Sequence, residues 1–82
     1  MADRSIKLKE LKAILARYNV GWTKGRGKGS HVLFHKQFPE GIFTYPVPTH
    51  NTNINVCYVQ ACRKKFRLRV TDGTTDQDFY GR

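Results

Sequence analysis

GRGKG (residues 25–29) followed by SHVLFHK (residues 30–36) is the stretch that decides the fold. The glycine-rich part favours a turn, because glycine adopts backbone conformations that strands and helices do not use. In the second part the side chains alternate between two faces, with Val32 and Phe34 on one and His31, Leu33 and His35 on the other. A period of two residues is typical of a strand with one buried face, so we predict a strand over residues 30–36.

The neighbouring segments extend this strand into a sheet. Residues 20–24 are apolar and aromatic, and residues 42–47 follow a Pro-Glu-Gly turn at 39–41. Tight turns join strands in antiparallel order. Because Pro46 and Pro48 cannot donate a ladder hydrogen bond, we expect the third strand either to lie at an edge of the sheet or to end early.

Two segments with helical periodicity enclose the strands. Residues 5–18 repeat leucine at spacings of three and four, with Ser5 as a candidate N-cap and Asn19 at the end, and residues 53–66 show similar apolar spacing. One face of the sheet has to be covered, and these helices are the available cover. We therefore predict an α+β domain of order α-β-β-β-α, a three-stranded antiparallel sheet with two helices on one face. The order is similar to that of the double-stranded-RNA-binding domain.

The charge is uneven along the chain. The 82 residues carry a formal charge of +9, of which residues 71–82 contribute −2, so residues 1–70 hold +11. We expect residues 1–70 to form the domain and residues 71–82 a polar, acidic tail, which Phe79 and Tyr80 can pin back onto the body. The tail aspartates are expected to be solvated. So basic a domain attracts polyanions, and RNA or DNA is the first expectation, with an anionic membrane surface or an acidic protein as alternatives.

Several site classes are excluded by the side chains present. Cys57 and Cys62 are five residues apart in a predicted helix, roughly 140° apart around its axis, so we expect two free thiols. Neither belongs to a Cys/His ligand pattern, and no carboxylate cluster suggests a two-metal nuclease. We expect no metal and no cofactor. With no long apolar run and no apolar signal core, a cytoplasmic location is expected.

His31 is the sharpest candidate for chemistry. The loop before it fails the nucleotide-binding glycine patterns, yet it offers backbone N–H groups, Arg26 and Lys28 to a phosphate. Histidine exchanges protons near neutral pH, so His31 can take the proton of an RNA 2′-hydroxyl while nearby cations, including Lys24, stabilise the transition state. The alternatives are a basic hairpin turn and an ordinary surface histidine.

Other candidates are less specific. His35 lies roughly 13 Å along the strand from His31, too far to share one phosphate, and is expected at a partner contact. His50 is expected to help start the second helix. The basic end of that helix is either a solvated face or a phosphate-tracking surface formed by Arg63, Lys64 and Arg67. Trp22, Phe43 and Tyr45 can stack on bases, but for Trp22 and Phe43 we expect core positions.

The motifs resemble those of the HicA family of messenger-RNA interferases. The match consists of Lys28-Gly29-Ser30-His31 with the hydrophobic strand after it, the turn Val47-Pro48-Thr49-His50, and the first-helix segment 10–15. The resemblance covers about residues 6–66. The second helix departs from the family pattern, and the chain continues beyond it.

The resemblance implies a toxin of a type II toxin–antitoxin pair, an endoribonuclease that cleaves messenger RNA without a metal and inhibits translation. His31 would be catalytic, with Lys24, Arg26 and Lys28 on the phosphate and Gly29 and Ser30 shaping the loop. A HicB-like antitoxin would cover the open face, where Leu33 and His35 would contact it. The rival hypotheses are a non-catalytic RNA- or DNA-binding module and a regulatory protein that binds an acidic partner.

Overall fold

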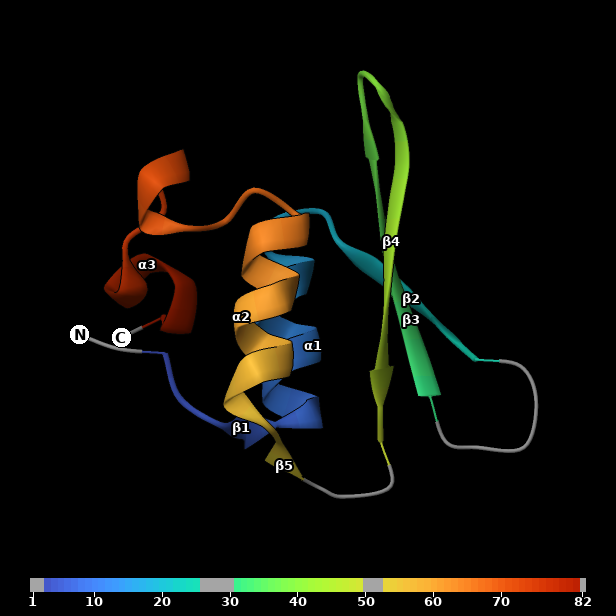
Figure 1. Ribbon diagram of the computed structural model, residues 1–82, viewed down its shortest axis with the longest axis horizontal. Coiled ribbons are helices and arrows are strands. Elements are labelled where there is room, and N and C mark those ends of the chain that lie inside the picture. The colour runs from blue at the N-terminus through green and yellow to red at the C-terminus, as the bar shows by residue number, and fades with distance from the viewer. Residues whose placement is uncertain (1–2, 26–30, 50–52, 82) are drawn as a thin grey trace.

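The alternating pattern around His31 does form the centre of a sheet. A computed structural model describes residues 3–25, 31–49 and 53–81 (Figure 1). The elements follow in the order β1 (Ile6–Lys7), α1 (Leu8–Ala16), β2 (Gly21–Lys24), β3 (His31–Phe38), β4 (Gly41–Pro48), β5 (Asn53–Ile54), α2 (Val56–Lys65), the 3₁₀ turn η1 (Val70–Asp72) and α3 (Asp76–Tyr80).

The main sheet is antiparallel with strand order β2-β3-β4. In β3, Val32 and Phe34 are buried, whereas His31 is exposed and Leu33 is half-buried. The alternation therefore divides the strand as predicted. The edge position of β4 is also confirmed, and its two prolines, which lack an N–H, suit a strand with only one neighbour.

Both long helices lie on the same side of this sheet (Figure 1). Helix α1 buries Leu11, Ile14 and Leu15, and α2 buries Val59 and Cys62. These side chains share one core with Val32, Phe34 and Val47 of the sheet. The predicted α+β class, with a three-stranded antiparallel sheet and helices in the α-β-β-β-α order, is confirmed.

The predicted helix starts were wrong. Residues 6 and 7 pair with residues 54 and 53 as the short strands β1 and β5, so α1 and α2 begin later than the periodicity suggested. Ser5 caps no helix, because its hydroxyl donates to the carbonyl of Ile54. The reason is the burial of Ile6 against Ile54, which are 4% and 1% exposed, a contact between segments far apart in sequence. α1 also ends earlier than predicted, at Ala16 with Arg17 as its C-cap, and Asn19, with a φ of 65°, lies in the turn that follows.

The C-terminal segment packs onto the side of the helices away from the sheet (Figure 1). Phe79 is fully buried and Tyr80 nearly so, and both belong to the core. Tyr18 stacks on Phe79 with ring centres 6.3 Å apart, and its hydroxyl donates to the carbonyl of Asp78. The described part of residues 71–82 is therefore held against the body by its aromatic side chains.

Of the aromatic residues expected in the core, Trp22 was assigned wrongly. Its side chain is 46% exposed, and the ammonium of Lys12 lies 3.6 Å from the ring centre. Because β2 is an edge strand, Trp22 lies at the margin of the helix-covered face. Phe43 is half-buried and packs on Phe38, with ring centres 4.7 Å apart.

Both cysteines are free, Cys57 exposed and Cys62 buried. Burial raises the pKa of the Cys62 thiol to about 12. Among the described residues, no helix has the length and apolar character needed to cross a membrane.

Candidate active site

His31 is the first residue of β3, and because it alternates with the buried Val32 it faces away from the helix-covered side of the sheet. Its side chain is exposed at the wall of a pocket of about 380 Å³. The pocket is lined by residues of all three strands and of the segment after β2: Thr23, Lys24, Gly25, His31, Leu33 and Pro46. Thr23, His31 and Leu33 face this space, whereas Lys24 pairs with the buried Val32, so its side chain leaves β2 toward the other face and the residue borders the pocket at the strand end.

Gly25 holds the backbone close to His31. Its N–H donates to the carbonyl of His31 over 2.8 Å. A Cβ at position 25 would stand 2.9 Å from the Cβ of His31 and 3.0 Å from its carbonyl oxygen, closer than real Cβ contacts. Only glycine fits this approach without a shift of the strand, so Gly25 fixes the start of the loop and the position of His31 together.

The described wall of the pocket carries no negative charge. Lys24 at its border is exposed, and no acidic residue lines the pocket in the part of the chain that the structure describes. Arg26, Lys28, Gly29 and Ser30, which sequence reasoning assigned to phosphate binding and loop shape, lie outside the described residues, as does His50. An anionic group at His31 would meet no described carboxylate of the pocket wall.

His35 lies on the same face but outside this pocket. It is half-buried and pairs with Gly21 of β2 and Thr44 of β4. Its imidazole covers Gly21, where an added Cβ would be 2.8 Å from the His35 Cε1. The two histidines therefore do not form one acid–base pair, as their spacing along the strand indicated.

The uncovered face is partly apolar. Leu33 pairs with Pro46 across β3 and β4, and Ile42 is 65% exposed farther along β4. Leu33 is half-buried, and Ile42 lies opposite Gln37, near the far end of β3 from His31. Leu33 lies in the His31 pocket itself, so whatever covers it also covers His31.

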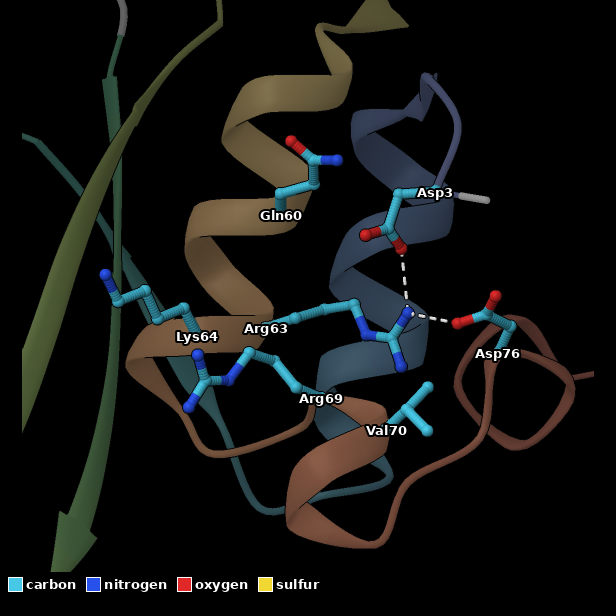
Figure 2. A pocket seen from close by; sticks show the side chains of 7 residues that line it. All are labelled: Asp3, Gln60, Arg63, Lys64, Arg69, Val70 and Asp76. Carbon is cyan, nitrogen blue, oxygen red and sulfur yellow. Dashed lines mark hydrogen bonds and ion pairs between the residues drawn. The ribbon is translucent and has the colours of Figure 1, made fainter. Parts of the chain in front are cut away.

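Arg63, predicted to contact RNA, does something else. Its side chain is 3% exposed, and one guanidinium nitrogen donates to Asp3 and to Asp76, each over 2.7 Å (Figure 2). Other nitrogens donate to the carbonyls of Leu68 and Thr74. Arg63 therefore ties both ends of the chain to α2, and the prediction that it tracks phosphates was wrong.

The pKa values in this cluster follow from the pairing. Burial by itself lowers the pKa of Arg63, but the hydrogen bonds to Asp76 and Asp3 outweigh burial and raise it. The bond from Arg63 in turn lowers the pKa of Asp76. Asp76, expected to be solvated, is thus a structural carboxylate, with a side chain only 14% exposed.

The remaining cations of the second helix are exposed. Lys64 and Arg67 line a separate groove beside β4, on the helix side of the sheet. Arg67 also donates to Glu40 at the β3–β4 turn, and this bond lowers the pKa of Glu40. Tyr45 lines the same groove. The sequence does not reveal that these cations lie beside Tyr45, because β4 and α2 are separate segments of the chain.

The chain matches no protein-family model, no curated protein and no solved structure. Function is therefore inferred from the side chains of the site and from the motif resemblance described above. Within the described ranges, no three His, Cys, Asp or Glu side chains are grouped so that they can hold a metal ion. What the described wall of the His31 pocket offers is an exposed imidazole and backbone that approaches it closely, with Lys24 at the pocket's border.

Proposed function

We propose that this protein is a metal-independent endoribonuclease of the HicA type, with His31 as its general acid–base. The supporting observation is that His31 is exposed in a pocket on the uncovered face of the sheet, and that no acidic residue lines the described wall of this pocket. A histidine without carboxylates around it suits a reaction at a phosphodiester, where the attacked group is anionic.

The chemistry needs few groups. The imidazole of His31 takes the proton of a 2′-hydroxyl, and the 2′ oxygen attacks the adjacent phosphorus. The bond to the 5′ oxygen breaks, and that oxygen takes a proton from solvent, which leaves a 2′,3′-cyclic phosphate and a 5′-hydroxyl end. Lys24, with Arg26 and Lys28 by the family resemblance, balances the added negative charge of the transition state. Gly29 and Ser30 would shape the loop.

The biological setting proposed with this chemistry is that of a toxin that cuts messenger RNA and inhibits translation. Its partner would be a HicB-like antitoxin that covers the open face. Leu33 in the pocket and His35 farther along β3 are the proposed contacts. The partly open Leu33 side chain in the pocket is the feature that supports such a partner.

Cleavage of a long mixed-sequence RNA in EDTA tests the proposal. General acid–base groups contribute about 10²- to 10⁴-fold to rate, so His31→Ala is expected to lower cleavage at least about 100-fold with RNA affinity unchanged. His35→Gln, at a histidine outside the pocket, is the matched control and is expected to cut as well as wild type. The expected products carry 2′,3′-cyclic phosphate ends.

Two outcomes would overturn it. Equal cutting by wild type and His31→Ala would remove His31 from the mechanism. Binding without cutting by both proteins would favour the non-catalytic RNA- or DNA-binding module, for which the exposed lysines on the described surface are the supporting feature.

A further inference from the structure

A second groove, of about 560 Å³, lies between β4 and the C-terminal end of α2. Its apolar lining comes from Phe43 and Tyr45 on the strand and Ala61 on the helix. Both aromatic side chains are half-buried, so part of each ring remains open to solvent. The groove offers a solvent-accessible aromatic surface on the face of the sheet opposite the His31 pocket.

The charged lining of the groove is strongly basic. It consists of Lys64, Lys65, Arg67 and Arg69, with Asp72 as the acidic member. Arg67 is paired with Glu40 and Arg69 with Asp72. Lys64 and Lys65 are exposed and make no ion pair with any other described residue, so their charge is available to a ligand.

The cations and the aromatic surface are in contact. The Lys65 ammonium lies 5.5 Å from the centre of the Phe43 ring, and the Arg67 guanidinium carbon lies 5.3 Å from it. Proteins that bind single-stranded nucleic acid combine these two features, an aromatic platform for a base and nearby cations for the backbone. A base paired and stacked inside an RNA duplex cannot present its face to such a platform.

The groove and the His31 pocket are neighbours across one strand. Tyr45 lines the groove and the next residue, Pro46, lines the pocket. Successive residues of a strand point to opposite faces, so the two sites are separated by the edge strand β4 alone. A flexible RNA strand that passes over this edge reaches both sites.

We propose that this groove binds a nucleotide of single-stranded RNA, with its base on Tyr45 and its flanking phosphates at Lys64 and Lys65. The groove would thereby restrict the His31 site to unpaired RNA, a role that rests on the proposed function. RNA binding by the groove does not depend on cleavage, so the two can be measured separately.

The test uses the whole 82-residue chain carrying His31→Ala, so that RNA stays intact, and measures anisotropy of a labelled RNA oligonucleotide and of its blunt duplex. The Lys64→Gln, Lys65→Gln double variant is expected to bind the single strand at least about tenfold more weakly. Its salt slope should fall by about 0.7 for each lysine, the value for single strands. The charge-matched control is Lys7→Gln, Lys9→Gln, at two exposed lysines that do not line the groove.

The base-stacking part is tested at Tyr45. Tyr45→Leu is expected to weaken single-strand binding about tenfold, within the range for the loss of one stacked base, while Tyr45→Phe keeps the ring and the affinity. Thermal unfolding of each variant confirms that it is folded. Duplex affinity should change less than single-strand affinity in Tyr45→Leu.

Groove variants that bind the single strand as tightly as their parent would overturn the proposal, as would an equal loss in the Lys7, Lys9 control. Binding of an acidic polypeptide such as poly-glutamate in place of RNA, lost in the same lysine variants, would assign the groove to a protein partner and would also overturn it. In a separate cleavage assay with His31 intact, an absence of cutting would reject the nuclease while leaving the groove result unaffected.

Discussion

Arg63 and His31 show how differently two basic side chains are used on the two sides of this small domain. Arg63 comes from the most basic run of the sequence, yet it is buried and its guanidinium is bonded to two carboxylates and two carbonyls. His31 is exposed in a pocket whose described wall holds no acidic residue. The comparison teaches that a run of positive charge does not identify a binding surface until the partners of each side chain are known.

The largest effect is expected from Phe79→Ala, which breaks the contact of the C-terminal segment with the core. Phe79 is fully buried and touches Tyr18 and Tyr80. Replacement of a buried phenylalanine by alanine costs about 3–5 kcal/mol, a large part of the free energy of unfolding of a small domain. Urea unfolding measures this. A loss below about 1 kcal/mol would show that residues 71–81 are a dispensable tail.

Arg63→Ala is expected to have the next largest effect, and it tests whether the buried Arg63 side chain stabilises the fold. Removal of one partner of a buried ion pair costs about 3 kcal/mol, because Asp3 and Asp76 would lose the guanidinium that balances their charges. Arg67→Ala is the matched control. Its pair with Glu40 is exposed, so its loss should destabilise the domain less than Arg63→Ala does. Equal effects of the two substitutions on urea unfolding would contradict the distinction.

Gly25→Ala perturbs the uncovered face of the sheet, where His31 lies. The added methyl would clash with the Cβ and carbonyl of His31, so strand and loop must shift. Overpacking of this kind costs about 1–3 kcal/mol. RNA cleavage should fall by more than the small change in the folded fraction explains, because His31 itself moves. Unchanged cleavage in a stable variant would show that the approach of Gly25 does not position His31.

The smallest effect concerns the reactivity of the two thiols and needs no substitution. Burial raises the pKa of the Cys62 thiol to about 12, so this group stays protonated at neutral pH and becomes a thiolate only as the pH rises toward that value. Cys57 is exposed. Titration of native protein with a thiol reagent at pH 8 should therefore modify one cysteine rapidly and the second only after unfolding. Rapid modification of both would show that the α2 side of the core is open.

The sheet was predictable because its signals are local. Alternation in residues 30–36 assigned Val32 and Phe34 to the core and His31 to the open face, and the prolines of β4 marked an edge. These patterns depend on the period of a strand and on the missing N–H of proline, which no distant contact changes.

The errors arose where distant segments meet. Ser5 was assigned to a helix cap because its partner, the carbonyl of Ile54, lies 49 residues away. Arg63 was expected either on a solvated face or at a phosphate, because its partner Asp3 lies 60 residues earlier and the sequence around Arg63 does not reveal it. Trp22 was placed in the core by its size, whereas its edge strand leaves it exposed. Similarly, the groove at Tyr45 exists only once β4 lies beside α2.

The most direct test of the account measures two quantities, the free energy of unfolding and RNA cleavage in EDTA per folded molecule, for His31→Ala and Arg63→Lys. The lysine keeps the positive charge but cannot reproduce the several bonds of the guanidinium. We predict that His31→Ala keeps wild-type stability and loses cleavage, whereas Arg63→Lys loses stability and its folded fraction cuts normally. The reverse pattern, or loss of cleavage in a fully stable Arg63→Lys protein with His31→Ala still active, would contradict the assignment of both residues.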